Sequence, residues 1–362
     1  MRKESMTSRQ AISVIVLFIF GSTIILGLNT EPKQDSWISL IIGIILSLPL
    51  VLMYARIIKL FPGESLYNIT ERLLGKVGGT IINIMITWYA IHLGSLVLRN
   101  FSEYAEISIL LHTPQIIVMI SIIFIAVYTA KMNIEILGKW GIFVLPIILI
   151  MVIITLILSI GDYNINNLFP IMEHSFKKVF DGGFKILAFP LAETVLILPL
   201  ADFFKKTDSS YKIYISSLII AGFTLLIIIF RNLLILGTPL MTLSYFPTFT
   251  AARIIELGEF LSRIEGVITI NFVLAEITKV TICLIVGAKG MAKLFNIKNY
   301  KNLALPVGLL IITLSLTQFS NVFQMFDFIK IYHIYAFPFQ IIIPMIIWVV
   351  GEIKTKNNKV VT

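Results

Sequence analysis

The sequence has little of what soluble enzymes use for chemistry. Its only cysteine is Cys283, so an internal disulfide framework is excluded. The four histidines, His92, His112, His174 and His333, are scattered without the spacing of metal ligands. No phosphate-binding glycine loop, nucleophile elbow or zinc motif occurs. We therefore expect no enzyme activity, no metal site and no cofactor.

Charge is also scarce. Only 14% of the 362 residues are charged, against about 25% in soluble domains. Hydrophobic residues make up 57%, the mean hydropathy is +0.94, and apolar runs of about 18 residues or more recur throughout. Helices satisfy their own backbone hydrogen bonds in lipid, so the sequence predicts an all-α polytopic membrane protein. The net charge of +9 fits lysines and arginines in inner loops beside membrane lipid, and we expect no nucleic-acid partner.

We expect one membrane domain over residues 1–362, with ten transmembrane helices. With the N-terminus inside, nineteen of the 29 lysines and arginines fall in inner segments and seven in outer ones, which places both termini in the cytoplasm. An outer segment, 237–262, contains Ile254, Ile255, Leu257 and Leu261 at helical spacing, which Ile264 just after it continues; this pattern predicts an amphipathic surface helix. The expected spans are 11–28, 37–58, 79–99, 114–130, 140–160, 184–200, 212–236, 263–288, 303–320 and 331–350.

Two of these segments carry helix-breaking residues. The first reads FGSTIILGLNT (20–30), with Gly21 and Gly27 around two small hydroxyl residues. The second reads AFPLAETVLILPL (188–200), where Pro190 and Pro199 bracket Glu193. Taken singly, the first fits close helix packing through small residues and the second a simple kink.

Their positions favour a joint interpretation. One segment begins the first five spans (9–160) and the other begins the second five (184–351). Five is odd, so a duplicated unit would insert its second copy upside down. Paired broken helices at matching places in inverted halves mark a binding site near the midplane. The sequence thus predicts a five-plus-five inverted repeat with broken helices 1 and 6.

A few polar residues lie within the expected spans. Glu193 is a ligand contact or proton-titrating group, or else a structural hydrogen-bonding group, and we favour function because an acid there is costly. Glu276 and Lys279 lie three residues apart and can pair on one helix face, which can equally be a neutral packing pair. Tyr89 can line a pocket. Arg231 is expected to snorkel outward.

At the outer end of the third span, Arg99, Glu103 and Glu106 fall at positions i, i+4 and i+7. Such spacing is typical of a solvated ladder of charges along one helix face.

Together these features resemble the B-subunit family of spore germinant receptors. The shared motifs are G-S-T-I-I-L-G in the first helix, F-P-L-A-E in the sixth, F-P-G-E-S-L-Y at 61–67, and A-R-I-I-E-L-G-E-F-L-S-R-I-E before the eighth. That family is related to the amino acid/polyamine/organocation (APC) permeases, so the resemblance implies a LeuT-like fold. It also implies A and C subunits as partners and the inner membrane of a spore. By the same resemblance, Lys279 stands in for a coupling cation or Glu276 carries a proton.

Two functions remain open. As a receptor subunit, the protein binds a small germinant between the broken helices and signals germination. As a proton- or cation-coupled amino-acid permease, it releases the same ligand inside. The glycine-flanked break in helix 1 would suit the carboxylate of a ligand, and Glu193 would suit its amine. An amino acid carries both groups, so we expect an amino acid as the ligand. The expected ligand-binding residues are Gly21, Ser22, Thr23, Gly27, Tyr89, Phe189, Ala192 and Glu193, with Glu276 and Lys279 as the coupling pair.

Overall fold

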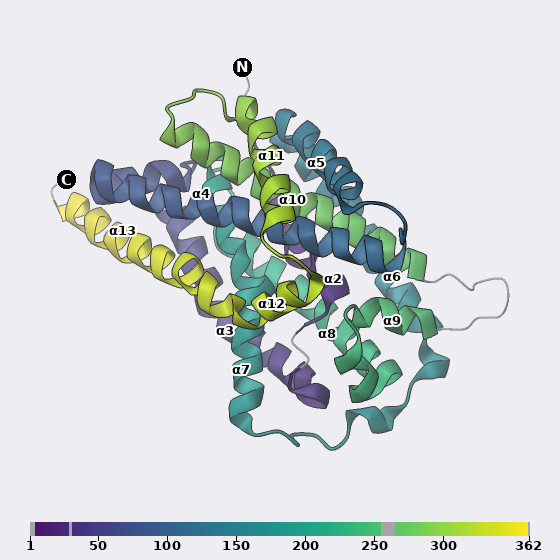
Figure 1. Ribbon diagram of the computed structural model, residues 1–362. Helices are drawn as coiled ribbons and strands as arrows, with labels where there is room; N and C mark the ends of the chain where they lie inside the picture. Colours follow the sequence, from purple (N-terminus) through teal and green to yellow (C-terminus); the bar gives the residue numbers. More distant parts are fainter. Residues whose placement is uncertain (1–3, 29–30, 255–264, 361–362) are drawn as a thin grey trace.

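The computed structural model describes residues 4–28, 31–254 and 265–360, and almost all of this part is helical (Figure 1). Eight helical stretches are long and apolar enough to cross a membrane. They are Lys33–Leu60, Leu66–Ser108, Ile134–Leu158, Phe176–Phe203, Ser210–Leu243, Glu265–Leu294, Tyr300–Thr317 and Val322–Lys356. Two shorter apolar helices, Ser8–Phe20 and Gln115–Lys131, accompany them. The chain is therefore an all-helical polytopic membrane protein, as its composition predicts.

The helices follow one another with short connections. Their bounds are α1 Ser8–Phe20, α2 Thr23–Leu26, α3 Ser36–Leu60, α4 Leu66–Ser108, α5 Gln115–Lys131, α6 Ile134–Leu158, α7 Phe176–Ile186, α8 Ser210–Leu243, α9 Pro247–Ile254, α10 Glu265–Leu294, α11 Ala304–Thr317, α12 Val322–Phe337 and α13 Ile343–Val360. Short 3-10 turns are η1 Lys33–Asp35, η2 Ile160–Asp162, η3 Ile165–Leu168 and η7 Tyr300–Leu303. Two π-helical turns, η4 Leu187–Leu191 and η8 Pro338–Ile342, and the 3-10 helix η5 Ala192–Phe203 complete the set.

Local sequence accounts for several helix ends and bends. Thr7 caps α1 through a reciprocal capping box with Gln10. Glycines with positive φ kink two long helices, Gly75 in α4 (φ 73°) and Gly237 in α8 (φ 61°). These kinks lie close to the predicted ends of two spans, at residues 79 and 236. The π-turn at Pro338 bends α12 against α13, the yellow-green and yellow pair in Figure 1.

Helix α10 lies at the centre and packs against α1, α4 and α5. It approaches α4 closely at Gly290, where an added Cβ would lie 1.9 Å from the Thr87 hydroxyl oxygen and 2.8 Å from the Tyr67 hydroxyl oxygen. One turn before Gly290 on α10, a Cβ on Gly287 would lie 2.8 Å from the Ile91 side chain. Small residues let membrane helices approach closely, which is why glycine occupies this seam.

Two arginines, Arg231 and Arg99, are more buried than the sequence suggests. Arg231 does not snorkel: it is 2% exposed, and its guanidinium donates to the hydroxyl of Thr155 at 2.8 Å and the side-chain carbonyl of Asn232 at 2.8 Å. Arg99 and Glu103 form a buried ion pair at 2.6 Å, not a solvated ladder. Since charge is costly in an apolar interior, these partners explain why both arginines are tolerated there: Glu103 and Asn232 on the same helices, and Thr155 and the Ser315 carbonyl on neighbouring ones.

The segment before α1 is fastened to the end of the helical stretch Phe176–Phe203, which is the sixth in chain order when the two shorter helices are counted. The Met6 amide donates to the Phe203 carbonyl at 2.7 Å, and the Met6 side chain is buried. Glu4 forms an ion pair with Lys301 at 2.7 Å. We call residues 4–7 the N-terminal strap; it lies at the end of the molecule that carries the N-terminus, at the top of Figure 1.

The predicted outer amphipathic segment, 237–262, is only partly described. Its first residues, 237–243, form the end of α8, and α9 follows and packs against α8, α10 and α2. Ile254, at the end of α9, is 37% exposed. Ile255, Leu257, Leu261 and Ile264 lie outside the described residues, so the surface helix there stays a prediction.

The α4–α10 seam gives a stability prediction. Gly290→Ala places a methyl group against Thr87, so the two helices must separate, and we expect a loss of about 1–3 kcal/mol in the free energy of unfolding. Gly266→Ala, where nothing lies within 4 Å of the added Cβ, is the matched control and should leave stability unchanged or slightly higher. Thermal unfolding in detergent compares the two variants. Equal melting temperatures would refute the close approach.

Candidate functional site

The first helix is broken beside a lysine of α10. Helix α1 ends at Phe20, and α2 begins at Thr23 after a break at Gly21. A Cβ on Gly21 would lie 2.2 Å from Cδ of Lys279, so the aliphatic stem of that lysine rests directly on the glycine. The break therefore needs glycine for steric reasons, and it brings helix 1 into contact with Lys279.

The sixth helical stretch is broken within its apolar run. Phe189 has non-helical φ and ψ (−131°, 113°), between α7 and the 3-10 helix η5. Side chains from other helices bond the carbonyls freed there. Gln340 donates to the Ala188 carbonyl at 2.8 Å, and the Tyr54 hydroxyl, which donates to the Gln340 carbonyl, lies 3.4 Å from the Ala192 carbonyl. Irregular backbone at membrane depth requires such substitute partners, and here the protein interior supplies them.

Glu193 lies at the first turn of η5 and is fully buried. Its Oε2 accepts a hydrogen bond from Nζ of Lys279 at 2.5 Å, and its Oε1 accepts one from the Tyr332 hydroxyl at 2.8 Å. Lys279 is also 0% exposed. A buried charge is tolerated when it is paired and hydrogen-bonded, and this carboxylate has both kinds of partner.

The hydrogen bonds continue from Tyr332 into three other elements. Its hydroxyl lies 2.9 Å from that of Tyr89 on α4. Gln340 of η8 donates to the Tyr89 hydroxyl at 2.8 Å, and Tyr54 of α3 donates to the Gln340 backbone carbonyl at 2.5 Å. The Phe339 ring stacks on Tyr89 with centroids 4.8 Å apart. One connected polar network thus joins η5, α10, α12, α4, η8 and α3.

Two aromatic rings face the lysine. The Nζ of Lys279 lies 5.3 Å from the ring centre of Phe18 on α1 and 5.2 Å from that of Phe189. At such distances the negative face of an aromatic ring attracts a cation. Lys279 is therefore held by both broken helices: by Phe18 and Gly21 of the first, and by Phe189 and Glu193 of the sixth.

The predicted pairing of Glu276 with Lys279 is wrong for this structure. Lys279 turns across to Glu193 on η5, whereas neither carboxylate oxygen of Glu276 has a hydrogen-bond partner among the described residues. Helical spacing places Glu276 and Lys279 on one face, but it does not reveal a competing carboxylate on a neighbouring helix.

A row of adjacent cavities leads from the protein surface toward Glu193. A small cavity of about 20 Å³ is lined by Glu193, Phe189 and Tyr332. Phe189 and Tyr332 also line a second cavity of about 310 Å³, which reaches Gly27, Lys185 and His333. The two rings lie edge to face, 6.1 Å apart, so they form the partition between the two cavities.

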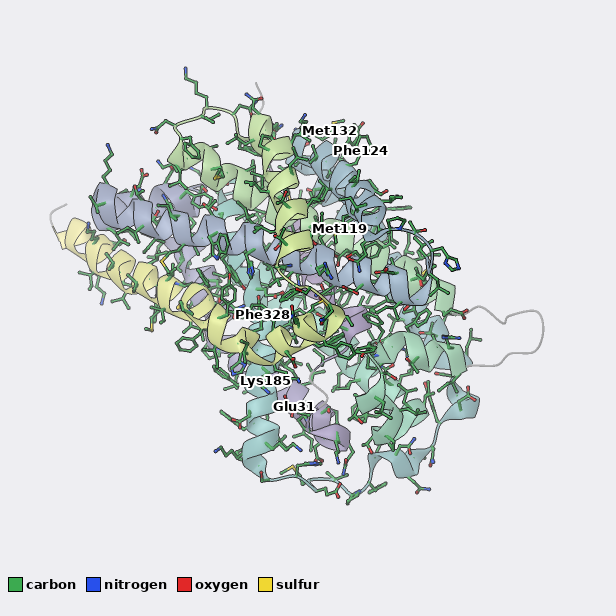
Figure 2. The ribbon with its side chains drawn as sticks, in the orientation of Figure 1. Glu31, Met119, Phe124, Met132, Lys185 and Phe328 are labelled. Atoms are coloured by element: carbon green, nitrogen blue, oxygen red, sulfur yellow. The ribbon has the colours of Figure 1, made fainter. Side chains whose placement is uncertain are left out.

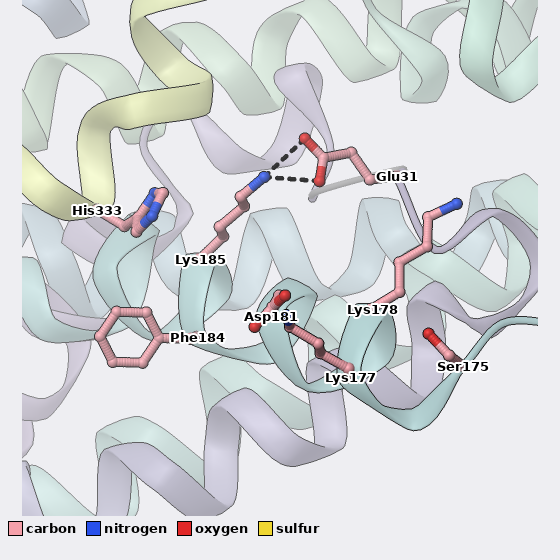
Figure 3. Close-up of a pocket in the computed structure, with 8 residues that line it drawn as sticks. All are labelled: Glu31, Ser175, Lys177, Lys178, Asp181, Phe184, Lys185 and His333. Atoms are coloured by element: carbon pink, nitrogen blue, oxygen red, sulfur yellow. Dashed lines mark hydrogen bonds and ion pairs between the residues drawn. The ribbon is translucent and has the colours of Figure 1, made fainter.

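The second cavity opens into a charged mouth of about 500 Å³ (Figure 3). Lys185 of α7 donates to both carboxylate oxygens of Glu31 at 2.7 and 2.6 Å, and both residues line the two cavities. Figure 2 shows the two side chains pointing toward one another beside α12. Lys177, Lys178 and Asp181 surround the mouth. A polar opening at the surface, followed by an apolar passage to a buried acid, is typical of a small-molecule site.

Of the other predicted ligand-binding residues, only Gly27 lines this row of cavities. Thr23 donates to the Ile19 carbonyl at 3.0 Å and lines a cavity of about 10 Å³ that also contacts Gly27. Ser22 is buried, and its hydroxyl has no hydrogen-bond partner among the described residues. Ala192 is buried and offers only its backbone carbonyl, to Tyr54. The structure thus gathers Gly21, Phe189, Tyr89, Lys279 and Glu193 at one point, with Gly27 farther out.

Sequence reasoning missed Tyr332, Gln340 and Tyr54. Gln340 carried a usable signal, because an amide within an apolar run seeks a hydrogen-bond partner. The two tyrosines carried none, since tyrosine is common in apolar helices.

Comparison with known proteins identifies the family. Residues 5–323 match the model of a family described as "Spore germination protein". The chain belongs to the spore germination protein family. It is 24% identical over 364 residues to spore germination protein KB of Bacillus subtilis (strain 168), a match that covers 99% of this chain and 98% of that protein. Spore germination protein YndE of the same organism is 22% identical, with 98% and 99% covered.

Solved structures identify the fold of this spore germination protein. Mhp1, a nucleobase-cation-symport-1 family transporter in a closed conformation with bromovinylhydantoin bound, superposes with a TM-score of 0.70 at 12% identity. That match covers 92% of this chain and 76% of Mhp1. MhsT in complex with L-phenylalanine gives a TM-score of 0.68 at 11% identity, with 96% and 89% covered. The fold is therefore that of the LeuT-fold transporters.

The buried ion pair gives a second prediction. Lys279→Met leaves Glu193 without its cation, and we expect a loss of about 3–5 kcal/mol in the free energy of unfolding. The double variant Glu193→Gln/Lys279→Met removes both charges and should recover most of that loss. Lys293→Met, which breaks the half-exposed pair with Glu71, is the control and should cost about 0–1 kcal/mol. Melting in detergent measures all three, and a double variant no more stable than Lys279→Met would exclude a charge-pair origin.

Proposed function

We propose that this chain is the integral membrane subunit of a spore nutrient-germinant receptor. In this proposal it binds a small germinant, an amino acid, between broken helices 1 and 6 and signals germination. The observation that carries the proposal is Glu193, a fully buried acid at the inner end of a row of cavities that begins at the outer mouth. An intramembrane acid that faces a protein interior is a functional site by default.

The chemistry of the site suits an amino acid. Lys279 already places an ammonium group 2.5 Å from Glu193, so the amine of a ligand can take the same position against the carboxylate. The carboxylate of the ligand then points toward the break in helix 1 around Gly21 and Ser22. Phe18 and Phe189, which face the ammonium of Lys279, would face the amine of the ligand in the same way.

The size of the inner cavity supports a mechanism by which binding would become a signal. A volume of about 20 Å³ holds roughly one water molecule, which is far less than an amino acid. Phe189 and Tyr332 must therefore move apart, and Tyr332 is hydrogen-bonded to both Glu193 and Tyr89. A ligand that binds only the opened arrangement shifts the population toward it. The network then carries the change to α4, α12 and η8.

The membrane arrangement within this proposal has ten spans in a five-plus-five inverted repeat. The eight long helical stretches, with the shorter Ser8–Phe20 and Gln115–Lys131, supply the ten. The repeats are 9–160 and 184–351, broken at Gly21 and Phe189. Both termini lie in the cytoplasm, as the bias of basic residues suggests. The family and the LeuT fold support this arrangement.

The setting follows from the family. We place the protein in the inner membrane of the spore, with germinant receptor A and C subunits as partners and lipid around its apolar face. Its relatives include proteins named spore germination protein A2 and B2. The described loops are short, so contacts with partner subunits would be made largely by membrane helices and the outer segment 237–262.

A coupled amino-acid permease is the second candidate. It is favoured by one observation, the shared fold with Mhp1, which is named as a transporter. Both functions use the same pocket. They differ in whether the ligand is released on the side of the N-terminal strap.

Binding and uptake by purified protein in liposomes test the proposal, with each of the twenty amino acids offered as a labelled probe. We expect at least one to bind saturably without accumulating. Glu193→Gln should weaken that binding at least about tenfold, since a hydrogen bond to a charged group contributes about 1.5–3 kcal/mol. Glu352→Gln, at the surface ion pair with Arg56, is the matched control and should bind normally.

The possible outcomes separate the two candidates. Accumulation driven by a proton gradient would make the protein a permease. Binding equal in wild type and Glu193→Gln would remove Glu193 from the site. Binding of none of the twenty would reject an amino acid as the ligand.

Labelling of introduced cysteines tests the orientation. Native Cys283 is 0% exposed, so a membrane-impermeant maleimide should not react with the unmodified protein in spheroplasts. Lys177→Cys in the outer mouth should be labelled, whereas Lys298→Cys, between α10 and η7, should be labelled only after lysis. Both lysines are exposed. The reverse pattern would invert the topology.

A further inference from the structure

Glu276 is a second carboxyl group within the core, and the polar network does not include it. It lies on α10, is 0% exposed, and neither of its oxygens has a hydrogen-bond partner among the described residues. An ionised carboxylate in such a place would lose its hydration and gain no hydrogen bond in return. The geometry is thus that of a neutral, protonated acid.

Lys279, the cation next to Glu276 along α10, is paired with a different carboxylate. Lys279 lies three residues after Glu276 on α10, within reach along the helix surface, yet its Nζ is 2.5 Å from Glu193 of η5. Other titratable groups on or against α10 include Cys283 on the helix itself and Tyr104 and Tyr67 of α4, and the two tyrosines bond to α10 away from Glu276. Tyr104 bonds near the outer end of α10 and Tyr67 bonds to a carbonyl near its inner end. Lys279 therefore stands between two carboxyl groups and pairs with one.

We propose that Glu276 is a proton-binding site, and that Lys279 moves from Glu193 to Glu276 when the ammonium group of a ligand occupies Glu193. The second half rests on the proposed function. The exchange balances: the carboxylic acid of Glu276 becomes a carboxylate and releases one proton, while Lys279 keeps all of its protons. Each binding event thus releases one proton.

The exchange keeps charges paired in both states. Before binding, Lys279 neutralises Glu193 and the proton neutralises Glu276. After binding, the ligand ammonium neutralises Glu193 and Lys279 neutralises Glu276. The stem of Lys279 rests on Gly21, so its movement changes the contact with the break in helix 1. The same lysine that exchanges partners can therefore report ligand occupancy to the first helix.

Infrared spectroscopy of the ligand-free protein in lipid near neutral pH tests both halves. The wild type should show the carbonyl stretch of a protonated carboxylic acid, and Glu276→Gln, which keeps the shape of the neutral acid, should abolish it. In Glu193→Gln, Lys279 loses its partner and should turn to Glu276, so the band should be lost there too. Glu352→Gln, at the surface pair, should keep the band.

A second variant guards against misfolding of Glu193→Gln. Glu193→Asp keeps a carboxylate but withdraws it by one methylene group, so the band should weaken relative to the wild type. Since no ligand is present, these outcomes do not depend on amino-acid binding. A wild-type spectrum with no band that Glu276→Gln removes would overturn the proton site. A band undiminished in both Glu193 variants would overturn the exchange.

Discussion

The buried ion pair between Glu193 and Lys279 constrains the rest of the structure. Two charges removed from water are tolerated only in close, hydrogen-bonded geometry, and this requirement fixes η5 against α10. Tyr332 satisfies the second carboxylate oxygen, and Phe18 and Phe189 face the ammonium. Gly21 is required by the same pair, because any larger residue would displace the lysine stem. The broken helices therefore meet at one electrostatic contact.

The break in the sixth stretch shows how irregular backbone is maintained away from water. Gln340, Tyr54, Ser65 and Lys289 place donor groups beside carbonyls that a continuous α-helix would have bonded itself. These donors come from η8, α3, the start of α4 and α10. Three carbonyls, those of Ala188, Ala192 and Pro199, thus tie the broken stretch to four neighbours, with Ser65 and Lys289 sharing that of Pro199, so a displacement of η5 disturbs several helices.

The sequence predicted much of this architecture and less of the site. Helix positions followed from apolar runs, and both breaks were visible as glycine and proline. The burial of Glu193 followed from its place in an apolar run. The partner of Lys279 could not be predicted, because helical periodicity shows which residues share a face but not which side chain a neighbouring helix presents. Tyr332 and Glu193 are separated by 139 positions, and only the packing of α12 against η4 brings them together.

The two ends of the molecule are unequal. One opens through a charged mouth toward Glu193, while the N-terminal strap crosses the other and is held there by the Met6–Phe203 hydrogen bond and the Glu4–Lys301 pair. The cavities that lead toward Glu193 therefore start from one end only among the described residues. In the receptor proposed above, such one-sided access would separate detecting a nutrient from leaking through the detector.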